Sequence, residues 1–522
     1  MNFQDTNTAV SDEAGNLLFY YNGVYINNAA HEVMAGGEAI NDCGGFDCEL
    51  GYDMFQGGLV LPDPSDPNRY YLFFGENGFY YIPQLQLVNT GLYYAVIDME
   101  EADGLGAVVA KDTVMTDTLE YGHLSAVRHA NGRDWWLFNK EEDTDHFYTT
   151  LLDPTGPHVI REFYSQDTIR SGVGQSAFSP DGRYYAKINL INAYEYFHLD
   201  LFEVDRCAGT LSNQLRDEMG DGEYLFMSGL AFSPNSRFLY LTRYEHIFQY
   251  DLWADDIMAS RDTVAIYEGP ITNFSSRFSL AQLAPDGKIY ITTTSGIPAM
   301  HVIHRPDEKG AACAVEQHLP IPTHSTTLPN FPYYRLGPID GSPCDTLGID
   351  NVPLANFRWA PQPDDSLQVQ FTDLSAYDPE TWKWQFGDGS SSTERCPVHT
   401  YAEEGYYLTC LLVTNEKGTH QRCRQLNLGV PVGTEAPTQS ASGVEVYPNP
   451  TTGAVHIQLD RALPVEVSFD LFDGLGRSVH RRLLPAHRDR FDLQLPMLPS
   501  GLYHYRIGSE SRLVGQGQLI LR

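Results

Sequence analysis

Basic residues are scarce in this chain, which has 34 lysines and arginines against 68 aspartates and glutamates in 522 residues. The net charge of −34 repels phosphate backbones and anionic lipid headgroups, so nucleic acid is not expected as a partner. The sequence also lacks any apolar run that approaches the roughly 18 residues of a membrane helix. We therefore expect no transmembrane segment.

The start of the chain lacks the features of a secretory signal. Residues 1–10 (MNFQDTNTAV) contain neither the charged segment nor the apolar segment of a signal peptide. For an exported protein, this start indicates either that the leader has been removed or that the true start lies further upstream in the gene.

Familiar catalytic signatures are missing as well, because the chain has no G-x-S-x-G, H-E-x-x-H or G-x-x-x-x-G-K motif. The best candidates for acid and base chemistry are His31, His123, His129, Asp134 and Glu141. A turn at residues 131–132 separates His129 from Asp134, so the simplest role of these two is to support a hairpin. We predict no catalytic residue and no cofactor. We also predict no metal site, since no cysteine pair lies near histidines at zinc-ligand spacing.

A turn followed by an aromatic or aliphatic strand recurs along the first 340 residues. Examples are H-A-N-G-R-D-W-W-L-F, F-S-P-D-G-R-Y-Y-A and L-A-P-D-G-K-I-Y-I. Aligned on the residue after the turn, the units lie 53, 64, 50, 54 and 51 residues apart, at Asn16, Arg69, Arg133, Arg183, Arg237 and Lys288. A period near 50 residues with short strands and no helical pattern is typical of propeller blades.

These repeats predict a β-propeller of six or seven blades over residues 1–345, with residues 328–340 closing the ring against the first blade. The strings S-D-E-A-G-N-L-L-F-Y-Y-N-G, V-R-H-A-N-G-R-D-W-W and F-E-V-D-R-C-A-G-T-L-S resemble a family of propeller proteins exported by the type IX secretion system. The resemblance covers nearly all of residues 5–340 and implies fold and export, but no defined activity.

Residues 352–430 alternate short strands and turns over about 80 residues, which predicts a small β-sandwich. Trp384, Phe386 and Tyr401 are its expected core. The strings W-Q-F-G-D-G and H-T-Y-A-E-E-G-Y-Y resemble a PKD domain across the whole module. Asp388 could be a calcium ligand, but an Asp-Gly pair after a strand is more often a turn.

Residues 431–443 are rich in Pro, Ser, Thr and Gly and predict a linker. The charge then changes, because residues 445–522 carry nine basic and eight acidic residues. Strands and turns here would suit a generic β-sandwich. Residues 444–522 more specifically resemble the type A sorting domain of type IX cargo, through Tyr447, Pro448, Asn449, Pro450, Gly453, Gly476, Gly501 and Tyr503. The resemblance implies passage through the outer membrane.

Eight cysteines favour an oxidising compartment. Cys43 and Cys48 close a short loop and are expected to form a local disulfide. Cys410 and Cys423 lie symmetrically about a Glu-Lys-Gly turn, as cross-strand partners would. Pairing cannot be deduced for Cys207, Cys313, Cys344 and Cys396.

Together these features predict an all-β protein: a propeller followed by two immunoglobulin-like sandwiches. We expect a secreted or cell-surface binding or adhesion protein of a Gram-negative bacterium, whose partners are the type IX machinery and a glycan or protein ligand. The alternative is a secreted enzyme that degrades polysaccharide or peptide, with its site at the mouth of the propeller.

Overall fold

The computed structural model describes most of the chain. It covers residues 5–12, 15–41, 51–52, 54–81, 85–165, 172–191, 196–219, 228–295, 297–321, 327–362, 365–428, 444–447, 451, 453–459, 467–472, 478–496, 498, 501–509 and 512–521. The chain forms two compact units, Met1–Leu428 and Gly429–Arg522. The predicted linker at 431–443 lies outside the described residues.

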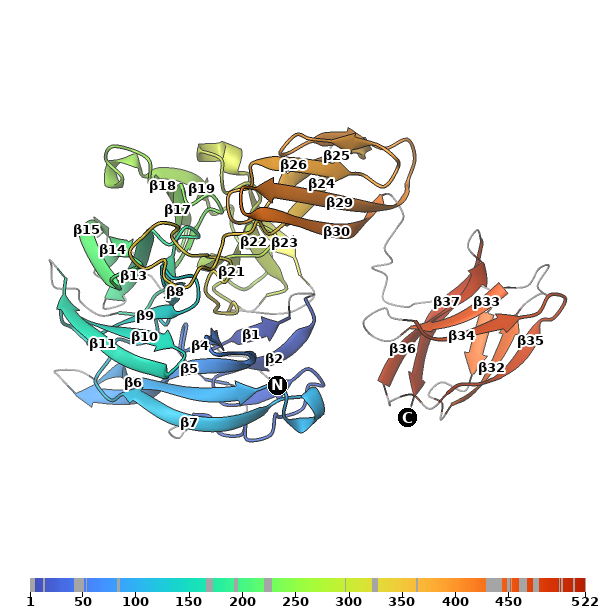
Figure 1. The fold of residues 1–522 in the computed structure, drawn as a ribbon, viewed down its shortest axis with the longest axis horizontal. Helices are drawn as coiled ribbons and strands as arrows, with labels where there is room; N and C mark the ends of the chain where they lie inside the picture. The colour runs from blue at the N-terminus through green and yellow to red at the C-terminus, as the bar shows by residue number, and fades with distance from the viewer. Residues whose placement is uncertain are drawn as a thin grey trace. The chain divides into compact units, whose positions relative to one another are not determined.

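The described part of residues 8–320 forms six antiparallel sheets, and Figure 1 shows them following one another around a common centre. The first sheet contains β1 (Thr8–Ser11), β2 (Leu17–Tyr21) and β3 (Ile26–Asn28). The second contains β4 (Gly58–Asp63), β5 (Asp66–Tyr81), β6 (Leu85–Asp98) and β7 (Ala107–Met115). The third contains β8 (Ala126–Arg128), β9 (Trp135–Lys140), β10 (His146–Asp153) and β11 (Gly156–Tyr164).

The next three sheets have four strands each. The fourth sheet contains β12 (Ser176–Phe178), β13 (Tyr184–Ile191), β14 (Tyr196–Asp205) and β15 (Thr210–Met219). The fifth contains β16 (Ser228–Phe232), β17 (Phe238–Arg243), β18 (His246–Asp251) and β19 (Asp262–Ile266). The sixth contains β20 (Phe278–Leu283), β21 (Ile289–Thr293), β22 (Ala299–Ile303) and β23 (Val315–Pro320). Short 3₁₀ turns η2 (Ala102–Gly104), η3 (Met258–Ser260) and η4 (Gly310–Cys313) interrupt the connections.

Each sheet packs its face on the next, which buries apolar side chains between neighbouring sheets. One buried cluster joins Leu199 and Leu201 of the fourth sheet to Leu239 and Leu241 of the fifth. Similar clusters lie between the first and second, second and third, and fifth and sixth sheets. The fold is a β-propeller, as the repeat predicts.

The repeated turn of the sequence is the connection between the first and second strands of each sheet. The amide of Gly182 donates to the carbonyl of Ser179, and the amide of Gly287 donates to that of Ala284, at 2.8 and 2.9 Å. Both glycines have positive φ, 71° and 76°, which side chains other than glycine adopt with strain. Because this turn has the same place in each sheet, these turns lie at one end of the propeller, which we call the turn end.

The segment after the sixth sheet returns to the start of the chain. The amide of Asn330 donates to the carbonyl of Asn7 at 2.7 Å, and Thr8 Oγ1 donates to the carbonyl of Asn330 at 2.7 Å. Thr327 Oγ1 donates to the carbonyl of Asp5. The expected closing contact between this segment and the first sheet is present.

A two-sheet sandwich follows within the same unit. One sheet orders its strands β24 (Phe357–Gln362), β25 (Asp365–Asp373) and β28 (Val398–Thr400), and the other β27 (Ser391–Ser392), β26 (Thr381–Gln385), β29 (Gly405–Asn415) and β30 (Gly418–Leu428). Trp384, Phe386 and Tyr401 are buried in its core, as predicted.

This sandwich packs against the turn end of the propeller. Arg358 Nη1 donates to the carbonyl of Asp286 at 3.1 Å, and Leu374 lies against Gly287, in the turn of the sixth sheet. The connecting segment covers two further turns, because Pro338 lies against Gly132 and Leu336 against Gly182. The propeller and the sandwich are thus joined by direct contacts as well as by the chain.

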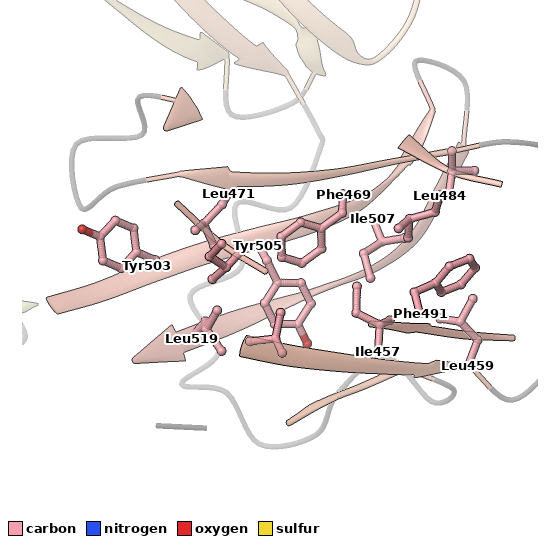
Figure 2. Close-up of a cluster of buried hydrophobic side chains, with 13 residues drawn as sticks. Ile457, Leu459, Phe469, Leu471, Leu484, Phe491, Tyr503, Tyr505, Ile507 and Leu519 are labelled. Carbon is pink, nitrogen blue, oxygen red and sulfur yellow. The ribbon is translucent and has the colours of Figure 1, made fainter. Parts of the chain in front are cut away.

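The second unit is a separate sandwich with its own core. Its sheets order β31 (Val444–Tyr447), β32 (Ala454–Leu459) and β35 (Arg490–Gln494), and β34 (Ser478–Leu484), β33 (Val467–Phe472), β36 (Gly501–Ser509) and β37 (Arg512–Leu521). Figure 2 shows side chains of both sheets meeting in the core, among them Ile457, Phe491, Phe469 and Ile507.

Candidate functional site

The inner strands of the propeller converge at its centre, where a ligand site could form. A cavity of about 60 Å³ is lined by residues of several inner strands together with residues 330–333. Ligand pockets usually measure about 300–1,000 Å³. This cavity therefore has room for a few water molecules and none for a sugar ring.

The polar side chains that line this cavity bind main-chain groups of the inner strands. Gln56 Nε2 donates to the carbonyl of Ser176, and Gln175 Oε1 accepts from the amides of Leu230 and Ala281. Because inner strands diverge from one another, their edge groups need such partners. The side-chain amides of Gln56 and Gln175 therefore stabilise the ring, and these hydrogen bonds occupy them.

His129 and Asp134 are brought together in the turn of the third sheet. The amide of Asn131 donates to His129 Nδ1 at 2.9 Å, and Asn131 Nδ2 donates to Asp134 Oδ2 at 2.7 Å. Arg133 Nε also donates to Asp134, at 2.7 Å. Burial lowers the pKa of His129, with Asp134 acting in the opposite direction. These contacts give both residues the hairpin-supporting role that the sequence suggests.

The other acid and base candidates lie outside this turn, and each has a different hydrogen-bond partner. His123 is buried, and its Nε2 donates to the carbonyl of Ile188 at 3.0 Å. Glu141 accepts from His146 at 3.1 Å, and exposed His31 contacts the hydroxyl of Tyr20 at 3.2 Å. A general acid and base must reach one substrate together, but these three side chains have separate hydrogen-bond partners and share no contact within the described residues.

A serine and a histidine do meet elsewhere, in the sixth sheet. Ser276 Oγ lies 3.0 Å from His318 Nε2, and Tyr267 OH lies 2.7 Å from the same oxygen. A nucleophile must be open to its substrate, whereas the Ser276 side chain is fully buried. This contact therefore belongs to the packing between the fifth and sixth sheets.

Buried charges that sequence reasoning missed form a row across the fourth sheet. Strand register places Ser176, Lys187, Asp200 and Arg216 directly opposite one another on four successive strands. Arg216 Nε donates to Asp200 Oδ1 at 2.7 Å. Lys187 contacts the carboxylate of Glu120, which precedes the third sheet. The row thus bridges two sheets.

The lysines of this region are shielded from solvent. Burial lowers the pKa of Lys187 to about 7, although nearby Asp200 raises it. Burial also lowers the pKa of Lys140 to about 8, against the opposing effect of Glu142. Removing one partner from such a buried pair is strongly destabilising. The cluster is closed to a substrate and acts in packing between the third and fourth sheets.

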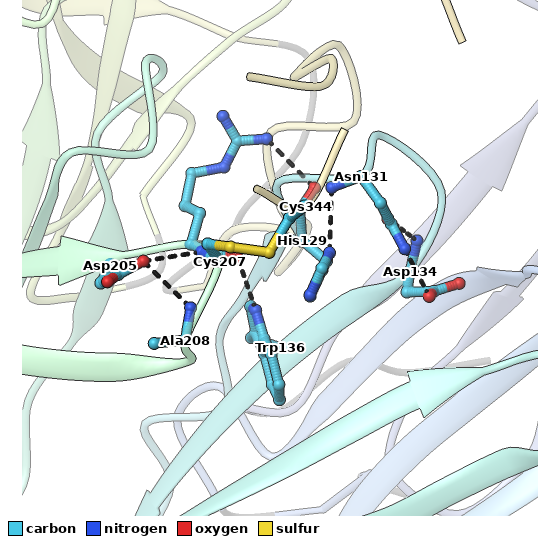
Figure 3. The surroundings of a disulfide bond; sticks show 9 residues. His129, Asn131, Asp134, Trp136, Asp205, Cys207, Ala208 and Cys344 are labelled. Carbon is cyan, nitrogen blue, oxygen red and sulfur yellow. Dashed lines mark hydrogen bonds between the residues drawn. A yellow bond between two sulfur atoms is a disulfide. The ribbon is translucent and has the colours of Figure 1, made fainter. Parts of the chain in front are cut away.

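Two disulfides lie in the described part of the first unit, Cys207–Cys344 and Cys410–Cys423. The second joins the strand partners that the hairpin symmetry predicts. The first, which the sequence does not reveal, ties the connecting segment to the fourth sheet (Figure 3). Cys313 and Cys396 are free thiols, and the expected pair Cys43 and Cys48 lies outside the described residues.

Figure 3 also shows how the neighbourhood of this disulfide is held. Trp136 Nε1 donates to the carbonyl of Arg206 at 2.8 Å, and Asp205 Oδ1 accepts from the amides of Cys207 and Ala208. Arg206 in turn donates to the carbonyl of Gly337. The disulfide therefore lies among hydrogen bonds that connect the third sheet, the fourth sheet and the segment after the propeller.

Asp388 of the sandwich accepts hydrogen bonds as a turn residue does. Its Oδ1 accepts from the amide of Ser390 at 2.9 Å, and its Oδ2 accepts from His399 Nε2 at 2.7 Å. Burial acts to raise the pKa of Asp388, but the bonds from Ser390 and His399 outweigh it and lower the pKa. Among the described residues, no group of three or more His, Cys, Asp or Glu could hold a metal ion.

The residues of the predicted sorting signal have different environments in the second unit. Tyr447 ends β31 and is 48% exposed, with its ring 5.5 Å from that of His456. Tyr503 is buried in the core, and Gly501 begins β36. Gly453 accepts from the amide of Leu495 at 2.7 Å. Pro448, Asn449, Pro450 and Gly476 lie outside the described residues.

Two parts of the chain match known domain families. Residues 355–430 match the PKD domain, and residues 445–522 match the secretion system C-terminal sorting domain. The chain carries a PKD domain and a secretion sorting domain. It is thus a secreted or cell-surface protein in which a propeller precedes these two domains. Among the described residues, no helix is long and apolar enough to cross a membrane.

Comparison with individual proteins adds local similarities. Collagenase ColQ1 of Bacillus cereus is 45% identical over 42 residues, which are 8% of this chain and only 4% of the collagenase. The PKD1 domain of Vibrio anguillarum Epp is 35% identical, with a TM-score of 0.14, and covers 15% of this chain and 95% of its own. The Nup133 propeller domain of Vanderwaltozyma polyspora is 10% identical, with a TM-score of 0.29, and covers 56% of this chain and 90% of its own. The assignment of the propeller rests on the strand pairing described above.

Proposed function

We propose that this protein is a binding or adhesion protein that the type IX secretion system exports to the outer surface of a Gram-negative bacterium or into the medium. The match of residues 445–522 to secretion sorting domains carries the export part of this proposal. That region also has a hydrophobic core of its own, so it can act as a signal independently of the protein to which it is attached.

A binding role agrees better with the geometry of the propeller than a catalytic role. The chain's own closing segment lines the small space at the axis. The acid and base candidates take part in hydrogen bonds within their own turns and sheets. A propeller of this kind offers a large, rigid outer surface for recognition, and in this proposal the ligand is a glycan or a protein.

The PKD domain is, in this proposal, a support for the propeller. Its contacts with the turn of the sixth sheet, through Arg358 and Leu374, make it a rigid extension. A support of this kind sets the direction in which the propeller faces its ligand. The segment after Leu428 then remains as the connection to the sorting domain.

Export is tested by transferring the second unit to another protein. Residues 429–522 are fused to a periplasmic reporter with a signal peptide and expressed in a bacterium with an active type IX system. We expect the reporter at the cell surface or in the medium, and the reporter without the fusion in the periplasm. Retention of both in the periplasm would contradict the proposal.

Binding is tested with the purified full chain on arrays of glycans and of peptides. We expect concentration-dependent retention on at least one class, which heat denaturation of the protein abolishes. A chain that is retained on neither array has no binding role of the kind proposed.

A further inference from the structure

Three side chains of the fifth sheet form a stack that runs from the core to the surface. The guanidinium of Arg237 lies over the ring of Phe238 at 4.8 Å and over the ring of Trp253 at 4.9 Å. Phe238 is fully buried, whereas Trp253 is 66% exposed. The indole is therefore the outermost layer of a stack whose base is fixed in the propeller core.

Ion pairs hold the middle layer of this stack in place. Arg237 donates from Nε and Nη2 to the two carboxylate oxygens of Asp251, at 3.0 and 2.8 Å. Lys309 from the sixth sheet reaches the same carboxylate at 3.3 Å. The amide of Trp253 donates to Asp251 Oδ1 at 3.2 Å. Asp251 thus fixes both the guanidinium and the backbone that carries the indole.

We propose that Trp253 is a stacking platform for a sugar ring of a neutral polysaccharide. The inference rests on the proposed binding function and names its ligand class. One side of the indole rests on the Arg237 guanidinium, and the large exposed fraction leaves the ring open to a ligand. A rigid, pre-positioned aromatic ring loses little conformational freedom on binding, which favours affinity.

The surroundings of the indole suit a sugar better than an apolar peptide. The C–H bonds on one face of a pyranose ring lie well against an aromatic surface, while its hydroxyl groups need both donors and acceptors at the edge. The ammonium of Lys309 is exposed and can donate, and the exposed carboxylates of Asp255 and Asp256 follow Trp253 closely in the chain. The net charge of −34 disfavours acidic polysaccharides.

Phe274 offers a matched comparison elsewhere on the propeller. It is as exposed as Trp253, at 67%, and lies in the connection between the fifth and sixth sheets. Within the described part of the chain it has no ring or cation contact that would fix it. Loss of Phe274 therefore removes similar exposed apolar surface without removing a supported platform.

The test measures retardation of the full chain in native gels that contain soluble β-glucan, mannan or xylan. Wild type, Trp253→Ala, Trp253→Phe and Phe274→Ala are compared, and unfolding temperatures confirm that each variant is folded. We expect at least one polysaccharide to retard the wild type. Trp253→Ala should weaken that binding by at least tenfold, Trp253→Phe should retain part of it, and Phe274→Ala should bind as the wild type does.

Fluorescence reports on the site directly, because Trp253 is the most exposed of the six tryptophans. The polysaccharide that retards the chain should protect this indole from acrylamide quenching, and the protection should be absent in Trp253→Phe. Protection that persists in this variant would place the ligand on another tryptophan and overturn the inference.

The remaining outcomes separate this inference from the proposed function. If Trp253→Ala binds the polysaccharide as tightly as the wild type, the platform is wrong but the binding role stands. If the wild type binds no polysaccharide yet is retained on a peptide array, the ligand class is wrong and the binding role again stands. Binding to neither polysaccharide nor peptide overturns both.

Discussion

The side-chain amide of Asn330 donates a hydrogen bond of 2.8 Å to the main-chain carbonyl of Leu124, which lies 206 residues earlier in the chain. The same nitrogen donates to the carbonyl of Gly58 at 2.9 Å. One buried residue of the closing segment therefore binds both the first strand of the second sheet and the segment just before the third sheet. This arrangement fixes the ring at its centre.

We predict that Asn330→Ala destabilises the propeller by about 2–4 kcal/mol, because it leaves buried carbonyl groups without partners. The matched control is Asn68→Ala, which removes an exposed amide bonded to Glu100 and should cost about 0.5 kcal/mol or less. Urea unfolding followed by tryptophan fluorescence measures both. Equal stability of the two variants would show that Asn330 does not hold the ring.

The Cys207–Cys344 disulfide closes a long loop, with a sequence separation of 137, whereas Cys410–Cys423 spans 13. Loop-closure entropy gives about 5 kcal/mol for the first and about 3 kcal/mol for the second. We expect Cys207→Ser with Cys344→Ser to be the more destabilising double variant. It should also admit protease cleavage between residues 333 and 351 in the folded protein, while Cys410→Ser with Cys423→Ser should not. An unchanged cleavage pattern would contradict this role.

We predict that the protein loses folding stability in mild acid because two of its histidines are buried. Burial lowers the pKa of His123 to about 4 and that of His301 to about 4. Between pH 4 and the unfolded value near 6.5, the unfolded chain binds more protons, so stability is complete above 6.5 and falls as the pH decreases. Each histidine should cost about 2 kcal/mol at pH 5.

The variant His301→Gln keeps a donor for the carbonyl of Ser276, which His301 Nε2 binds at 2.8 Å. Its unfolding temperature should fall less between pH 7 and pH 5 than that of the wild type. His31→Gln, at an exposed position, serves as the control and should follow the wild type. An identical decrease for all three proteins would exclude His301 as a source of the acid sensitivity.

Tyr447 and Tyr503 separate recognition from folding in the sorting domain. Tyr447 is 48% exposed and Tyr503 is 6% exposed. We expect Tyr447→Ala to leave the unfolding temperature almost unchanged while it reduces export. Tyr503→Ala should cost about 3–5 kcal/mol through the cavity that it creates. Surface fractions and thermal melts of both variants provide the measurement, and full export of Tyr447→Ala would show that this tyrosine is not read by the secretion machinery.

The sequence predicts the architecture well because the repeat marks one turn in every sheet. The residues aligned from Asn16 to Lys288 lie at or just after the connection between the first and second strands. In three of these turns Gly132, Gly182 and Gly287 have the positive φ that glycine adopts without strain. The core of the PKD domain is similarly evident, since Trp384 and Tyr401 stand in recognisable strings. Six sheets lie in the described residues, while six or seven blades stays the prediction.

The buried features depend on register and are not visible in the sequence. Lys187 is the one charged residue of β13, but its position opposite Asp200 requires the pairing of two strands. The Cys207–Cys344 pair joins a strand connection to a segment beyond the last sheet, which no spacing rule predicts. Trp253 likewise becomes notable only once Arg237 is found on its face.

In the proposed function, the C-terminal unit directs this protein out of the cell. The most direct test expresses the full chain with a signal peptide in a bacterium with an active type IX system and compares it with a deletion of residues 444–522. We predict that the intact chain reaches the surface or the medium, and that the deleted form stays in the periplasm. Equal export of both forms would contradict the account and leave residues 444–522 as an ordinary β-sandwich.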